Sequence, residues 1–238
     1  MKTLSAAALL LAALLFWPRP ADPLPGFPHV FLWAWERPEN LEFLDPRTTG
    51  VAFLARTVCL GGGTVSVRPR LNPLRYPPGA TLMAVVRVEP RDATLPPVEA
   101  ASAAIAEAAA IPGVRALQVD FDATLSQRPF YRSLLSDLRH RVPQSMPISM
   151  TALTSWCESD TWMAGLPVAE AVPMLFRMGP GEHPARTFRP PLCRSSAGVS
   201  LDEPLREPPS AARLYIFNPR PWTAASYQAA LREVRKWH

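Results

Sequence analysis

The stretch Val-Arg-Ala-Leu-Gln-Val-Asp-Phe-Asp, residues 114–122, alternates apolar with polar side chains and ends on two carboxylates. Such alternation is typical of a β-strand, in which residues two apart point to the same face. One face of this strand is apolar and suits packing against helices, whereas the other carries Gln118, Asp120 and Asp122. Two carboxylates roughly 6–7 Å apart on one face are expected to couple their titrations and to raise one pKa. The alternative is that both are structural and pair with inward-pointing arginines.

Seven further apolar segments, mostly β-branched or aromatic and ended by Pro, Gly or charged residues, are also predicted to be strands. They are His29–Trp35, Val51–Val58, Thr81–Val88, Pro147–Leu153, Ala171–Arg177, Ala197–Leu201 and Arg213–Asn218. Helical spacing of apolar residues predicts three helices between or after them. These are Pro97–Ala110, Pro129–Arg141 and Thr223–Trp237.

Strands that alternate with helices favour a parallel sheet, and eight of them suit a closed barrel. Such a barrel typically needs about 250 residues, whereas this chain has 238. The connections 61–80, with an extra strand at Thr64–Arg68, and 179–194 are proline-rich and show no helical pattern. The sequence therefore predicts an α/β fold, an irregular TIM-like (β/α)₈ barrel with some helices short or missing. Residues 27–238 are expected to form it as a single domain.

The first 21 residues have the layout of a secretory signal. Lys2 gives a positive start, residues 4–17 are mostly Leu and Ala, and Pro18 ends the run. The run is shorter than the roughly 20 residues of a membrane-spanning helix. No clean Ala-x-Ala site follows, so both a cleaved signal peptide and an uncleaved N-terminal anchor remain open. We expect a periplasmic or secreted protein, or one held at the inner membrane by its N-terminus.

The net charge is +5, and the basic residues are almost all arginine without a dense run. A nucleic-acid surface needs basic residues clustered on one face, so no nucleic-acid partner is expected. The four histidines are scattered and no Cys-x-x-Cys pair occurs, which disfavours a zinc site. Neither a metal nor another cofactor is expected.

Three cysteines are present, Cys59, Cys157 and Cys193. A disulfide would suit an oxidising compartment. Cys157 and Cys193 fall in predicted loops, whereas Cys59 closes an apolar run, so we expect Cys157 to pair with Cys193 and Cys59 to be buried. Three unpaired, buried thiols are the alternative.

Polar side chains recur near the carboxyl ends of the predicted strands, which is the end where such barrels carry their active sites. We call this end the mouth. A ring of acidic, basic and amide groups there would suit a hydroxyl-rich ligand. The candidate catalytic carboxylates are Asp120, Asp122, Asp202 and Glu89. The candidate polar ligand contacts are Glu36, Arg87, Gln118, Arg177 and Asn218, and Arg56 also ends a predicted strand.

Tryptophans are predicted at the same end of the barrel. Trp35 ends the first predicted strand, Trp156 follows the fifth and Trp222 follows the eighth. Flat rings with a polar N–H are natural platforms for sugars. Ordinary core packing is the alternative for each of them, and for Trp33 it is the favoured interpretation.

The segment Val-Asp-Phe-Asp-Ala-Thr, residues 119–124, resembles the fourth-strand Asp-x-Asp-x-Glu signature of chitinase-like barrels, glycoside hydrolase family eighteen. In that family the terminal Glu is the general acid, and the preceding Asp orients the acetamido group of the substrate. The resemblance places Asp120 and Asp122 at the two aspartates. Thr124 stands where the acid should be, so the chain departs from the family at the residue that protonates the leaving group.

Longer stretches resemble a bacterial family of exported proteins of unknown function. They are Phe31–Pro38, Gln118–Thr124, Ala171–Gly179 and Gly198–Pro204. This resemblance covers most of the mature chain. It implies a glycosidase-like barrel and export, without an assigned activity.

Two functions follow, both with a polysaccharide or oligosaccharide as partner and with the membrane contacted only through an uncleaved leader. The first is a carbohydrate-active enzyme of glycoside hydrolase type that acts on an envelope or extracellular glycan. Asp122 is its candidate acid, opposite Asp202, Glu89 or Glu36, because glycosidases use two carboxyl groups across the scissile bond. The alternative, favoured by Thr124, is a non-catalytic saccharide-binding envelope protein on a degenerate glycosidase barrel. A third, weaker hypothesis is an envelope interaction protein whose inward charges are purely structural.

Overall fold

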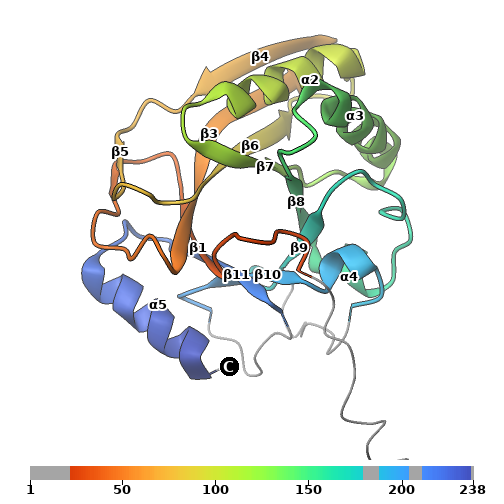
Figure 1. Cartoon of the computed structure of the whole chain (residues 1–238). Helices are drawn as coiled ribbons and strands as arrows, with labels where there is room; N and C mark the ends of the chain where they lie inside the picture. Colours follow the sequence, from red (N-terminus) through yellow and green to blue (C-terminus); the bar gives the residue numbers. More distant parts are fainter. Residues whose placement is uncertain (1–21, 179–187, 204–210, 237–238) are drawn as a thin grey trace, which may run out of the picture.

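The computed structural model describes residues 22–178, 188–203 and 211–236. The expected leader, residues 1–21, lies outside the described residues. Eight parallel strands form a closed barrel, because β1 pairs with β11 on one side and with β3 on the other (Figure 1). In order around the barrel they are β1 (Val30–Ala34), β3 (Thr49–Gly61), β6 (Leu82–Pro90), β7 (Val114–Asp120), β8 (Ile148–Leu153), β9 (Glu170–Met174), β10 (Ser196–Ser200) and β11 (Arg213–Phe217). The predicted irregular TIM-like barrel is confirmed.

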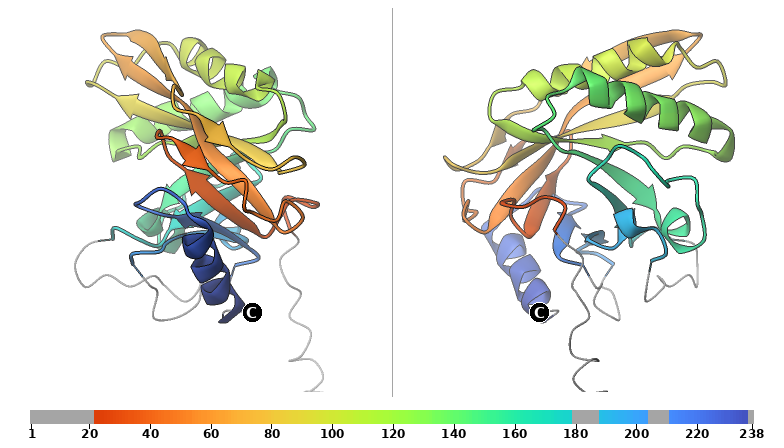
Figure 2. Two further views of the ribbon diagram at one scale, coloured as in Figure 1. Left: turned by 90° about the vertical axis from the view of Figure 1, so that its left-hand side faces the viewer. Right: turned by 45° about the vertical axis from the view of Figure 1, so that its right-hand side comes forward.

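Helices cover only part of the barrel. After β6 come α2 (Val98–Ala106) and the 3₁₀ turn η1 (Glu107–Ala110), and after β7 come η2 (Leu125–Gln127) and α3 (Arg128–Arg141). Helices α2 and α3 lie side by side outside the barrel (Figures 1 and 2). The short α4 (Thr154–Glu158) follows β8, η3 (Pro191–Cys193) precedes β10, and α5 (Ala224–Lys236) ends the described chain. Among the described residues, no helix is both long and apolar enough to cross a bilayer.

The connections on either side of β3 contain short strands in place of helices. The two-residue strands β2 (Glu39–Asn40) and β5 (Leu74–Arg75) pair with each other. Strand β4 (Thr64–Pro69) runs antiparallel to the end of β3, as the extra strand expected from the sequence, and is mostly exposed. Gly62 and Gly63 make the turn with φ of 56° and 69°, a conformation that costs glycine little.

A β-bulge in β3 reverses the side-chain alternation between Leu54 and Arg56. Before the bulge Leu54 points into the barrel, and after it Thr57 lines the mouth. Arg56 instead points outward, where it donates to the Ala104 carbonyl at 3.1 Å and pairs with Glu107 at 2.6 Å. The expectation that Arg56 lies at the mouth is therefore wrong, because the extra residue shifts the alternation.

The alternation seen in the sequence divides the core into two. The apolar face of β7 packs outward into the cluster that contains Tyr131 and Leu134 of α3. A second cluster fills the barrel interior with Phe31, Trp33, Tyr215 and other inward-facing side chains. The ring of Phe31 lies so close to Gly50 that a Cβ there would stand 2.4 Å from it. The barrel interior is thus a packed core.

The segment just after the expected leader closes the N-terminal end of the barrel. Leu24 is buried in the interior cluster, and this segment runs across the ring of strands (Figure 1, red). Arg213, the first residue of β11, holds the segment through Asp22 and the carbonyls of Leu24 and Pro28. The opposite end, where the strands finish, is the mouth.

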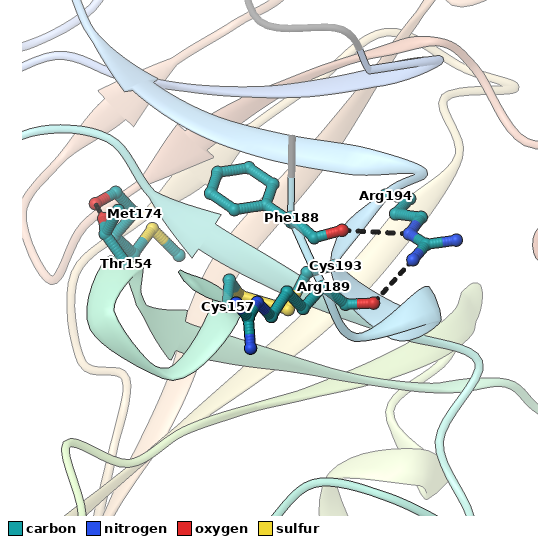
Figure 3. The surroundings of a disulfide bond; sticks show 7 residues. All are labelled: Thr154, Cys157, Met174, Phe188, Arg189, Cys193 and Arg194. Carbon is teal, nitrogen blue, oxygen red and sulfur yellow. Dashed lines mark hydrogen bonds between the residues drawn. A yellow bond between two sulfur atoms is a disulfide. The ribbon is translucent and has the colours of Figure 1, made fainter. Parts of the chain in front are cut away.

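Cys157 and Cys193 form a disulfide, and Cys59 is a buried free thiol. This is the pairing expected from the sequence, although both partners lie in short helical turns, α4 and η3, and not in open loops. Figure 3 shows that the disulfide joins α4 to the turn that leads into β10.

Candidate functional site

Asp120 is the last residue of β7 and points into the barrel at the mouth. Its Oδ1 accepts a hydrogen bond from Thr151 Oγ1 at 2.9 Å, and its Oδ2 accepts one from Arg87 Nη1 at 3.3 Å. Burial raises its pKa to about 6; Arg87 opposes this rise, the negative charge of Asp122 adds to it and the Thr151 hydrogen bond opposes it. One pKa of the carboxylate pair is raised, as expected, but burial is the main cause and the neighbouring carboxylate of Asp122 contributes less.

This pKa predicts how stability varies with pH. Because the folded-state value of about 6 exceeds the ordinary 3.8, proton binding by Asp120 stabilises the fold at low pH. That stabilisation is fully present below the ordinary pKa and is lost as pH rises through the folded-state pKa. In wild type, this rise in pH should lower the free energy of unfolding by roughly 2–3 kcal/mol, and Asp120→Asn is expected to abolish that decrease.

Urea unfolding of wild type and Asp120→Asn at several pH values between 3.5 and 7 measures this difference. Glu42→Gln, at an exposed carboxylate, is the matched control and should leave the wild-type profile unchanged. An Asp120→Asn variant whose stability still falls over the wild-type range would show that another group carries the transition.

Glu89 is surrounded by arginines. Its Oε1 accepts from Arg87 Nε at 3.2 Å, and its Oε2 accepts from Arg68 at 2.9 Å and from Arg91 at 3.3 Å. Arg87 also contacts Asp120, so it bridges the two carboxylates. Glu89 and Asp120 thus have the arginine partners that the structural alternative predicts.

Asp122 lies just beyond β7, is exposed, and makes no hydrogen bond or ion pair with any residue that the structure describes. Together with Arg87, Glu89, Arg91 and Asp120 it lines a pocket of about 280 Å³. Because Asp122 has no such partner in the described part of the chain, it is the carboxylate of this pocket best placed to meet a ligand.

A second pocket of about 440 Å³ adjoins the first, because Arg87 and Glu89 line both. It adds Trp35, Glu36, Leu54, Thr57, Arg68, Pro69, Leu71 and Asn72. The two pockets together make up the charged part of the mouth.

The neighbouring part of the mouth is aromatic. Phe217 at the end of β11 lies 4.3 Å from Trp33, 4.6 Å from Phe176 and 6.0 Å from Trp35, between ring centroids. Trp35 and Phe176 are partly exposed, whereas Trp33 is fully buried, as favoured from the sequence. The sequence analysis did not identify Phe176 and Phe217, which support Trp35 from the interior core, although the alternation that points Tyr215 into the barrel also points Phe217 inward.

Trp156 and Trp222 do not lie at the mouth. Trp156 is 1% exposed and packs edge-on against Trp162 in the outer core. Trp222 is 4% exposed in the same core, where its Nε1 donates to the Trp33 carbonyl at 2.9 Å. Both expectations of sugar contact are corrected, because each residue follows a strand end where the chain turns outward over the barrel.

Gln118 and Asn218 are also buried, and neither lines the two pockets. Gln118 lies deeper in the barrel than Asp120 and donates to Ser149 Oγ at 2.9 Å. Asn218 accepts from the Arg220 backbone N–H at 3.1 Å and so holds the turn that leads toward α5. The expectation that these two amides contact a ligand is corrected.

Of the remaining candidates, Glu36 lines the larger pocket but is held by hydrogen bonds, and the other two lie outside both pockets. Glu36 Oε1 accepts three hydrogen bonds from Leu71 and Asn72; burial alone would raise its pKa, but these bonds lower it. Asp202 accepts from the Ser200 hydroxyl, and the Arg177 backbone N–H donates to Glu203 at 2.7 Å. Neither Asp202 nor Arg177 lines the two pockets, so the structure brings together only three of the four candidate catalytic carboxylates.

Within the described part of the chain, no group of three or more His, Cys, Asp or Glu side chains is arranged to hold a metal ion. The charged side chains of the site come mainly from β4, β6 and β7 and from the residues just after β6 and β7, and aromatic side chains lie beside them.

A family model described as Domain of unknown function (DUF3142) matches residues 79–174, and no glycosidase or chitinase family is found. The matched segment begins just before β6 and ends with β9, so it contains Arg87, Glu89, Asp120 and Asp122. This agrees with the resemblance to a family of unknown function. No curated protein and no solved structure matches the chain.

Proposed function

We propose that the mouth of this barrel binds a saccharide. The observation that supports it is a charged pocket around Arg87 and Glu89 that is also lined by Trp35, with the rings of Phe217 and Phe176 packed next to Trp35. A sugar ring has hydroxyl groups at its edge and apolar C–H groups on its faces. Its hydroxyls suit the charged side, and its faces suit aromatic rings.

Two features favour binding over hydrolysis. Asp120 and Glu89 already have arginine partners. Thr124 takes the place of the acid in the chitinase-like signature, and its backbone N–H is bonded to the Gln127 side chain at 2.9 Å. A saccharide-binding protein on a degenerate glycosidase barrel is therefore the favoured function. The leader expected at residues 1–21 and the Cys157–Cys193 disulfide support a periplasmic or secreted location.

Hydrolysis of a glycosidic bond is the second candidate, and one observation favours it. A carboxyl with a pKa of about 6, as Asp120 has, is well suited to general acid catalysis near neutral pH. Asp120 then replaces Asp122, the acid expected from the sequence, and Asp122, which lines the same pocket, would be the second carboxylate. Asp120 would then protonate the leaving oxygen while Asp122 activates water.

Binding is measured by titrating the protein with envelope and extracellular oligosaccharides and following tryptophan fluorescence. Trp35→Ala is expected to weaken binding about tenfold, because it removes the ring on which the sugar face stacks. Tyr76→Ala, at an exposed aromatic residue outside both pockets, is the matched control and should bind as wild type does.

Product analysis on the same oligosaccharides separates the two candidates. Products released by wild type and absent with Asp120→Asn would establish hydrolysis. Binding without products would establish the saccharide-binding function. If none of the oligosaccharides binds, neither function is correct and the inward charges are structural.

A further inference from the structure

Three arginines at the mouth share one carboxylate, that of Glu89, although the two pockets also contain Glu36, Asp120 and Asp122. Three guanidinium groups, those of Arg68, Arg87 and Arg91, converge on Glu89 at 2.9–3.3 Å. Arg87 is shared with Asp120, but Arg68 and Arg91 have no second carboxylate among the described residues. Because the three like charges repel one another, an anion that contacts Arg68 and Arg91 away from Asp122 would offset this repulsion.

Arg68 and Arg91 also keep donors free for a ligand. A guanidinium has five N–H groups, yet within the described chain Arg68 donates only to Glu89, and Arg91 only to Glu89 and Cys59. Their side chains are 61% and 55% exposed. Arg68 lines the larger pocket and Arg91 the smaller one, so a ligand that spans both pockets passes both arginines.

Other charges limit which anion fits. Asp122 lines the smaller pocket and has no hydrogen-bond or ion-pair partner among the described residues, so it would repel a second negative group placed there. The larger pocket contains Trp35 and Leu71, which suit the uncharged face of a ring. The mouth therefore suits one anionic group beside the arginines, with a neutral unit next to it, better than a polymer charged at every unit.

We infer that the saccharide is acidic, with a uronate ring whose carboxylate pairs with Arg68 and Arg91 and a neutral ring that lies on Trp35. This inference rests on the proposed saccharide-binding function. Guanidinium and carboxylate groups match as planar, charge-assisted hydrogen-bonding partners, which makes arginine well suited to this recognition. The net charge of +5 also attracts acidic glycans to the protein.

The test compares a tetrasaccharide of alternating glucuronate and N-acetylglucosamine with the same tetrasaccharide after its carboxylates are reduced to alcohols. The acidic form is expected to bind at least about tenfold more tightly, as suits hydrogen bonds to a charged group, and rising salt should shrink the difference. Arg68→Gln and Arg91→Gln should each remove most of the preference. Both side chains are largely exposed, so folding should not be affected.

Arg47→Gln is the control, since it removes the same charge from an 86% exposed side chain just before β3, at the far end of the barrel. It should keep the full preference. Equal affinity for the two tetrasaccharides would overturn the inference while leaving saccharide binding intact. No affinity for either form or for any neutral glycan would refute the proposed function itself. A single-stranded oligonucleotide that binds as tightly as the acidic form, and is equally weakened by Arg68→Gln, would show a general polyanion surface and overturn the inference.

Discussion

Replacing Arg213 with methionine is expected to lower the free energy of unfolding by about 3–5 kcal/mol, because it leaves buried negative charge without its partner. Arg213 is fully buried at the N-terminal end of the barrel. Its Nη1 lies 3.6 Å from Glu170 Oε2, and neither side chain is exposed. Glu170 also accepts hydrogen bonds from Ser149 and Tyr215, so it cannot turn toward solvent without breaking them.

The same arginine secures the segment that closes the barrel. Arg213 Nη2 contacts both carboxylate oxygens of Asp22 at 3.1 and 3.2 Å and the Leu24 carbonyl at 3.0 Å, and Nε donates to the Pro28 carbonyl at 3.0 Å. Methionine keeps much of the volume but none of these donors. Residues 22–28 should therefore exchange their amide hydrogens faster in the variant, in addition to the global loss.

Urea unfolding of Arg213→Met against wild type measures the loss, with Arg235→Met on the exposed surface of α5 as control. Adding Glu170→Gln should recover part of the stability, because it removes the uncompensated charge. Lowering the pH should also recover part of the stability of Arg213→Met. Burial already raises the pKa of Glu170, and protonation of that carboxyl removes the charge left unpaired. A loss below about 1 kcal/mol, or no recovery in the double variant, would refute this account.

Removing the disulfide is the second change with a large expected effect. The Cys157→Ala/Cys193→Ala variant is expected to lose about 4 kcal/mol, since the bond links residues 36 positions apart and restricts the unfolded chain. Both sulfur positions are buried, and alanine adds no polar group to the core. Thermal or urea unfolding without reductant gives the difference.

The bond lies where the barrel has its shortest strand pairing. Strands β9 and β10 are joined through one register pair, Gly198 with Met174, whereas β8 and β9 share five. Cys193 lies three residues before the start of β10, and Thr154 of α4 donates to the Met174 carbonyl at 2.7 Å (Figure 3). The disulfide thus holds α4 and the start of β10 on the two sides of this pairing.

Cys59→Ala is the matched control, because it removes a buried thiol that forms no disulfide. It should lose clearly less stability than the double variant. Wild type in the presence of a thiol reductant should approach the double variant, which itself should not respond to reductant. If wild type and the double variant unfold alike without reductant, the disulfide is not a source of stability.

Sequence alone was sufficient for the barrel. Period-two alternation in segments such as Val114–Asp120, together with breaks at Pro and Gly, located all eight strands to within about three residues at their ends. The same alternation showed which face of β7 carries Asp120, because within a regular strand side-chain direction depends only on position. Charged side chains at the end of a strand were therefore visible before any contact was known.

Only the tertiary structure shows which residues these charged side chains contact. Arg68 comes from β4 in a connection without a helix, and it reaches Glu89 only because β4 folds back on β3. The β3 bulge turned Arg56 outward, and the turns after β8 and β11 carried Trp156 and Trp222 into the outer core. Alternation ends where a strand ends or bulges, and an ion pair between distant segments depends on how the whole sheet closes. Side-chain direction is thus encoded locally, whereas the partner of each side chain is a property of the closed barrel.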